Sequence, residues 1–82
     1  MLFYEIEIRN RLNQLLSTLN YNDKDVALVG FSNTIQKFKK WGLESIEIKL
    51  IEMEKIKKKI KKIQTIKTHY IPKKQKEDKN VR

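Results

Sequence analysis

The chain has 82 residues, enough for one small domain. A domain of this size buries only about 60% of the surface that it exposes when unfolded, so the core has to be thin. Nineteen lysines and arginines against 10 acids give a net charge of +9 and a pI near 9.9, which predicts anionic partners. There is no cysteine, which excludes disulfides and thiolate metal sites and leaves dimerisation as a way to bury more surface.

The first elements follow from two different periodicities. Residues 4–9 alternate apolar and charged side chains, the pattern of a strand with one face on a core. Four leucines between positions 12 and 19 then fall within one helical stripe, and Asn10 can serve as N-cap. Residues 10–20 are therefore predicted to form an amphipathic helix, which the polar residues at 20–23 break.

The middle of the chain is predicted to hold a strand followed by a short helix. Residues 25–31 are an apolar run between polar turn residues, typical of a strand buried on both faces, although the same run could begin a helix. Ser32 is a good N-cap for a helix over 33–41. Gly42 stands where the C-terminal cap of that helix belongs.

The C-terminal half is predicted to hold two strands around a lysine-rich segment. Residues 44–51 are interpreted as a strand because alternate apolar residues line one face. Residues 52–62 are predicted to be either a basic helix or a hairpin arm. Residues 63–71 are rich in β-branched and aromatic side chains and end at Pro72, which predicts a last strand.

These elements predict an α+β fold in a small two-layer domain. The expected order is strand, helix, strand, helix, strand, basic hairpin or helix, and strand. The single domain covers residues 1–72, and a disordered basic tail is expected over 73–82. The alternative is an all-α three-helix bundle with a long basic C-terminal helix, because apolar residues keep helical spacing from Ile46 to Ile63.

The stretch from Val29 to Lys37 is predicted to run from a strand through a glycine-containing turn into a helix. It is similar to the second strand and following helix of the Alba family, which includes archaeal chromatin proteins and protein subunits of RNase P and MRP. Residues 62–67 resemble the last strand of that family, and the predicted order of elements is also similar. Ser32 departs from the family pattern, which commonly has a second glycine there, and the second helix is shorter than usual.

The resemblance spans residues 3–72 and carries implications for function. It implies a homodimer or heterodimer that grips nucleic acid with basic loops and a basic hairpin. Arg9 and Arg11 would lie in the loop after the first strand. Lys55 to Lys62 would form the hairpin arm.

The positive charge is concentrated in the second half of the chain. Before residue 36, four acids nearly balance three basic residues, and after it the lysines dominate. The densest run, residues 55–63, holds six lysines that could neutralise phosphates, although a solvated lysine face remains the alternative. Trp41 and Tyr70 lie beside lysines and are candidates for stacking on bases. The predicted nucleic-acid-binding residues are Arg9, Arg11, Lys37, Lys40, Trp41, Lys55, Lys57, Lys58, Lys59, Lys61, Lys62, Lys67 and Tyr70.

Catalysis and metal binding are not expected. His69 is the only histidine and has no second ligand within strand or helix reach, so neither a metal site nor a general base is predicted. Glu5 and Glu7 have the spacing of an ordinary exposed strand face. We therefore expect no enzyme, no cofactor and no small-molecule substrate.

Residues 25–36 also share features with a helix-turn-helix, namely a small residue, a turn glycine and a following helix. The first helix and the step to the second come out one residue short. This would rotate Ile35 by about 100° away from the packing face, so the helix-turn-helix is only an alternative.

The sequence therefore favours a non-catalytic protein that binds RNA or DNA mainly through the phosphate backbone, within a ribonucleoprotein or chromatin complex or on its own. The alternative is a small helical adaptor or inhibitor, of phage or plasmid type, whose residues 44–66 form one long helix that binds an acidic protein. No stretch reaches the roughly 18 apolar residues of a membrane span, and the N-terminus lacks the pattern of a signal peptide. We expect an intracellular protein with no membrane partner.

Overall fold

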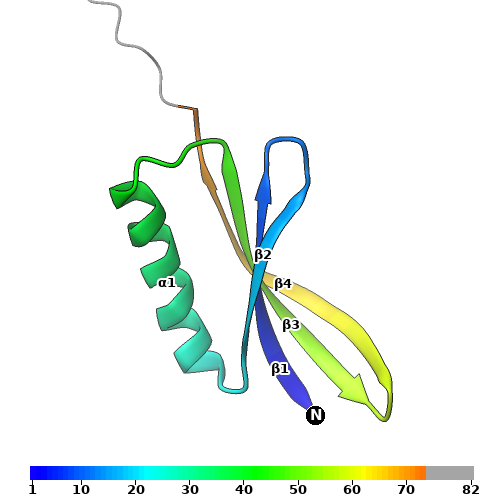
Figure 1. The fold of residues 1–82 in the computed structure, drawn as a ribbon. Coiled ribbons are helices and arrows are strands. Elements are labelled where there is room, and N and C mark those ends of the chain that lie inside the picture. The colour runs from blue at the N-terminus through cyan, green and yellow to red at the C-terminus, as the bar shows by residue number, and fades with distance from the viewer. Residues whose placement is uncertain (74–82) are drawn as a thin grey trace, which may run out of the picture.

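A computed structural model describes residues 1–73 and shows one antiparallel sheet with a single helix on one of its faces (Figure 1). The strand order is β2-β1-β3-β4. β1 is antiparallel to both β2 and β3, so β2, α1 and β3 form a split β-α-β unit around β1. The elements in chain order are β1 (Leu2–Asn10), β2 (Leu15–Tyr21), α1 (Lys24–Lys40), β3 (Ile46–Ile56) and β4 (Lys59–Ile71).

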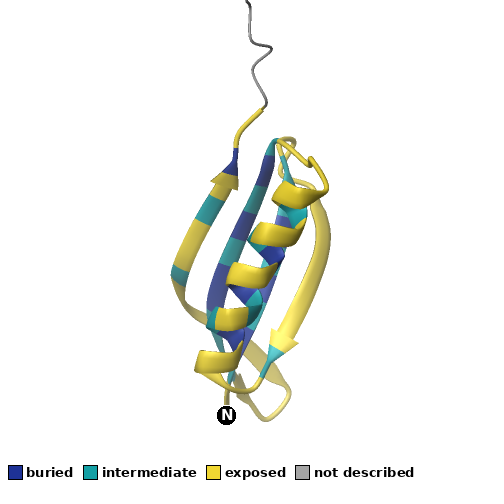
Figure 2. Ribbon diagram, turned by 90° about the vertical axis from the view of Figure 1, so that its left-hand side faces the viewer, coloured by how far each residue is buried: buried dark blue, intermediate teal, exposed yellow. Residues whose placement is uncertain are grey.

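The core lies between α1 and the two central strands. In Figure 2 these strands alternate between dark blue and teal behind the helix, whereas β2 and most of β4 are exposed. Alternate residues of β1 and β3 point toward α1, so the period-two pattern of both segments is confirmed. The core cluster consists of Tyr4, Ile6, Ile8, Ala27, Phe31, Ile46, Ile48, Leu50 and Ile71.

Three predicted strands are confirmed. Residues 4–9 lie within β1 and residues 63–71 within β4, whereas the strand predicted over 44–51 begins two residues later, at Ile46 of β3. Of the two options for residues 52–62, the hairpin arm is right and the basic helix is wrong. β3 continues to Ile56, the chain turns, and β4 begins at Lys59. The α+β class is confirmed, and the all-α alternative is wrong.

The amphipathic helix predicted over residues 10–20 is wrong. The side chain of Asn10 accepts hydrogen bonds from the backbone N–H groups of Leu12 (2.9 Å) and Gln14 (3.0 Å), which closes a turn between β1 and β2. Asparagine bonds its own backbone at turns and at helix N-caps alike, so its presence does not distinguish the two. The leucines stay exposed, because pairing with the edge of β1 satisfies the backbone of β2 without burying a helical stripe.

The strand predicted over residues 25–31 is also wrong, and its helical alternative is right. One helix, α1, covers the whole region, with Asp23 as N-cap accepting a hydrogen bond from the N–H of Val26 (3.1 Å). Ser32 therefore lies inside the helix and is not an N-cap. The helix-turn-helix alternative is wrong because a single helix replaces the two that it requires. The predicted order of elements is also wrong, since β2 replaces the first helix and α1 replaces the second strand. That order is one of the features on which the Alba resemblance is based.

Gly30 misled the sequence interpretation because a glycine inside an apolar run suggests a turn. In the structure it lies within α1, where Tyr21 of β2 packs against the helix. A side chain at Gly30 would collide with the Tyr21 ring and hydroxyl. The glycine therefore serves a close approach between helix and sheet.

The predicted cap at Gly42 is confirmed. Gly42 has a φ of +74°, its N–H donates to the carbonyl of Lys39 (3.0 Å), and the N–H of Leu43 donates to the carbonyl of Phe38 (3.0 Å). This is the Schellman arrangement, in which a left-handed glycine ends a helix.

The basic tail is predicted over residues 73–82. From residue 74 onward it lies outside the described residues.

Candidate nucleic-acid interface

The β3–β4 hairpin extends past the start of β1 and forms a projection that we name the basic arm, residues 55–62. The last contact with β1 is at Met1, whose carbonyl accepts a hydrogen bond from the N–H of Lys55 (2.8 Å) and whose ammonium group donates to the Lys55 carbonyl (3.1 Å). Beyond this point no described strand flanks the hairpin (Figure 1). Both edges of the arm are therefore unpaired, and all of its residues are exposed.

The arm carries the densest positive charge of the molecule. Residues 1–54 hold seven lysines and arginines against eight acids, whereas residues 55–82 hold twelve against two. Within residues 1–73, no carboxylate forms an ion pair with a lysine of the arm. The six lysines, all exposed, are Lys55, Lys57, Lys58, Lys59, Lys61 and Lys62.

Pairing across the arm places lysine opposite isoleucine in the two pairs nearest the tip, whereas Lys61 faces Glu54 and Lys62 faces Met53. Lys55 faces Ile60 and Ile56 faces Lys59, so no two lysines stand directly opposite each other in these pairs. Ile56 and Ile60 are 55% and 60% exposed. Together with the stems of neighbouring lysines they line a shallow hollow of about 720 Å³ at the tip. The sequence pattern indicated the lysines as binding residues but did not predict that Ile56 and Ile60 are exposed beside them.

The turn at the tip of the arm departs from the usual turn chemistry. It consists of Lys57 and Lys58, and Lys57 has a φ of 57°, in the left-handed region. Two-residue hairpin turns favour glycine, asparagine or aspartate where φ is positive, and a residue with a Cβ costs on the order of 1 kcal/mol there. The chain thus keeps a cation at its most protruding point against the local backbone preference.

A second group of predicted residues lies at the C-terminal end of α1. The Lys37 Nζ lies 5.5 Å from the centroid of the Trp41 ring, and the ring of Phe38 lies 6.0 Å from that of Trp41. Trp41 is 63% exposed. Lys37, Lys39 and Lys40 occupy the last turn of α1, where cations are favoured by the helix dipole without any external partner.

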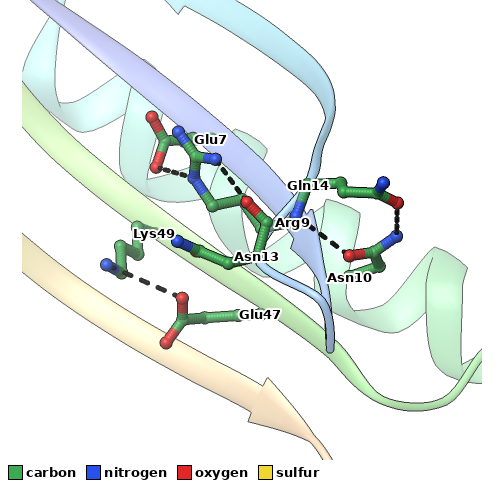
Figure 3. Close-up of polar contacts among 7 residues, drawn as sticks. All are labelled: Glu7, Arg9, Asn10, Asn13, Gln14, Glu47 and Lys49. Atoms are coloured by element: carbon green, nitrogen blue, oxygen red, sulfur yellow. Dashed lines mark hydrogen bonds and ion pairs between the residues drawn. The ribbon is translucent and has the colours of Figure 1, made fainter.

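Arg9 is engaged within the sheet and the first hairpin. Its Nε donates to Glu7 Oε1 (2.9 Å) and its Nη1 donates to the carbonyl of Asn13 (2.8 Å), as Figure 3 shows. The hydrogen bond that Arg9 donates to Glu7 raises the pKa of Arg9 and outweighs the opposing effect of burial. On the same uncovered face, Lys49 pairs with Glu47 (3.6 Å). These two ion pairs balance their own charges, and Glu5 adds a negative charge on the same face, so it is not a basic surface.

The predicted residues do not form one surface. β3 runs for 11 residues from the end that holds Trp41 to the basic arm. At about 3.3 Å per residue, this places the two ends roughly 33 Å apart. Tyr70, which is 50% exposed, and Arg9 both pair with Glu47 of β3, at the end of the sheet far from the arm. Lys67 lies between the two ends. The arm lysines form a cluster, but Arg9, Arg11, Lys37, Lys40, Trp41 and Tyr70 do not join it.

His69 is half-buried in β4 beside α1, and among residues 1–73 no three potential metal ligands come together. Within the same range, no helix is long and apolar enough to cross a membrane.

Comparison of the chain with protein-family models, curated proteins and solved structures found no match. The function therefore has to be inferred from charge and geometry.

Proposed function

We propose that the protein binds nucleic acid through the basic arm and does not act as an enzyme. The observation that carries this proposal is the separation of charge: the body is close to neutral, whereas the arm holds six exposed lysines, none of which forms an ion pair with a carboxylate among the described residues. Like charges held this close repel one another unless a polyanion lies against them. Each phosphate that a lysine neutralises also releases a bound counterion.

The shape of the arm favours duplex DNA over duplex RNA. The major groove of B-DNA is about 12 Å wide and admits a two-stranded β-ribbon, whereas the major groove of A-form RNA is deep and narrow. The arm is such a ribbon, with lysines on both of its faces. Lysine acts as a point charge without the bidentate geometry of arginine, so little sequence preference is expected.

The adaptor alternative loses its structural basis. It required one long helix over residues 44–66, and these residues form β3, a turn and most of β4. An acidic protein would meet the same lysines, so competition distinguishes the two partners. Duplex DNA should displace an acidic polypeptide such as polyglutamate from the arm, and the reverse order of affinity would favour the protein partner.

The salt dependence of binding to a short DNA duplex tests the proposal. Fluorescence anisotropy over a salt series should give a slope of log affinity against log salt of about −5 if six phosphates are contacted. Replacing Lys57, Lys58, Lys59 and Lys61 with alanine should flatten this slope by about 3 to 4 units. The matched control replaces Lys24, Lys37, Lys39 and Lys40 of α1, which removes the same charge.

The two variants separate a specific arm from general basicity. The proposal expects the α1 control to change the slope by less than about one unit. Equal flattening in both variants would show that the net charge alone drives binding. An unchanged slope in the arm variant would remove the arm from the interface and overturn the proposal.

A further inference from the structure

The two edges of the sheet are protected very differently. Edge strands expose unpaired backbone groups, and natural proteins shield them with lysines, prolines or bulges. β4 carries four lysines, and its register with β3 shifts twice. β2 contains neither a charged residue nor a proline, and its one register shift with β1 lies near its first residues. Ser17 to Tyr21 therefore form a regular, uncharged and open edge.

Apolar side chains line this open edge. Leu15, Leu16 and Leu19 of β2 are 51%, 52% and 41% exposed. Leu19 pairs with Ile6, so it lies on the face of the sheet that α1 covers. Val26, also exposed, lies one helical turn before Gly30 and so on the side of α1 that meets Tyr21 of β2. Leu15 pairs with Arg9 and so lies on the opposite face. The edge thus offers backbone hydrogen bonds beside exposed apolar side chains on both faces of the sheet.

We propose that two copies of the chain pair through β2 in antiparallel fashion, which makes one continuous sheet of eight strands. The order across the sheet would be β4-β3-β1-β2-β2-β1-β3-β4. A two-fold axis passes between the β2 strands, so each strand meets the same uncharged surface that it presents. This pairing covers the leucines of β2 and enlarges a core that is small in the single chain.

The distribution of charge selects a second copy as the occupant and β2 as the place. A chain with a net charge of +9 can meet itself only where its cations stay apart. Seven strand spacings of about 4.8 Å separate the two β4 strands by roughly 34 Å, several times the Debye length of about 8 Å at physiological salt. Pairing through β4 would instead bring the basic arms together. An acidic or basic partner finds no charge on β2 to recognise.

Single cysteines test this interface directly, because the native chain has none. In an antiparallel pair, opposed residues have Cα atoms about 4.5 to 5.5 Å apart, within the range that a disulfide bridges. The variants are Ser17→Cys, Thr18→Cys and Leu19→Cys, which cover neighbouring symmetric registers. The matched control is Thr68→Cys, an exposed threonine on β4.

Oxidation is carried out in high salt after nuclease treatment, so that nucleic acid cannot bridge two copies. At least one β2 variant should form a covalent dimer ten or more times faster than Thr68→Cys. Sedimentation equilibrium of the native chain should give twice its mass of 9.9 kDa. Thr18→Lys should give the monomer mass with an unchanged circular dichroism spectrum, because a lysine on β2 blocks strand pairing.

The result that overturns the proposal is a native chain that remains monomeric at several hundred micromolar. Cross-linking of Thr68→Cys at the same rate as the β2 variants, or faster, would also overturn it. If Thr18→Lys does not fold, the comparison of cysteine variants still decides, because those substitutions are small and exposed. The measurements contain no nucleic acid, so their outcome is independent of the function proposed for the arm.

Discussion

Ile48 and Ile60 are the same residue type on adjacent strands of one sheet, yet Ile48 is fully buried and Ile60 is 60% exposed. Ile48 belongs to the body, where β1, β3 and α1 enclose a core and the charges are balanced. Ile60 belongs to the basic arm, whose residues are all exposed and whose lysines form no ion pair within the described part of the chain. The contrast suggests that stability and partner binding reside in different parts of the chain and can be changed separately.

Alanine at these two positions gives the largest expected difference. Ile48→Ala leaves a cavity in the core and should lower the free energy of unfolding by about 2 to 5 kcal/mol. Ile60→Ala removes the same atoms from an exposed position and should change it by less than about 0.5 kcal/mol. Chemical denaturation monitored by circular dichroism measures both. Similar losses in the two variants would show that the arm is packed against something in solution.

The core was the part of the fold that sequence reasoning could predict. The alternation around Ile6 and Ile48 is diagnostic because both strands have one face in the core and one face outside it. Edge strand β2 lacks that asymmetry, since both of its faces are exposed, and its leucines match a helical stripe equally well. Gly30 was misread because its reason, the ring of Tyr21, lies in another element.

The candidate site was predictable in composition but not in extent. The lysine run after residue 54 identified the arm, because its charge density does not depend on the fold. Sequence does not give the distance along β3 that separates Arg9 and Trp41 from the arm. The pairing of β1 with β3, which fixes that distance, is a long-range contact that no local pattern reveals.

A substitution of intermediate effect separates the turn's conformation from its charge. Lys57→Gly should relieve the positive φ and stabilise the protein by up to about 1 kcal/mol. It should also flatten the salt dependence of DNA binding by about 0.9, because one cation is lost. Lys58→Gly removes the same charge where φ is not positive, so it should weaken binding equally without stabilising. Equal changes in stability for the two variants would contradict this account of the turn.

The smallest effect concerns Glu5 on the uncovered face of the body. Partial burial, and secondarily the neighbouring Glu7, raises the pKa of Glu5 above its ordinary value of 4.5. The folded state therefore binds a proton more readily than the unfolded state, and this residue's contribution to stability falls as pH rises from 4.5 through the raised pKa. Glu5→Gln should stabilise the protein at pH 7 by less than about 0.5 kcal/mol, and the gain should disappear below pH 4.5.

A matched control for this effect is Glu47→Gln on the same face. It removes a carboxylate that pairs with Lys49, so no gain in stability is expected at neutral pH. Thermal unfolding of both variants and the native chain between pH 4 and pH 7 makes the comparison. A gain for Glu5→Gln that grows as the pH falls would reverse the sign required by a raised pKa. Equal gains from both glutamines would instead indicate that the face responds to its total negative charge and not to the burial of Glu5.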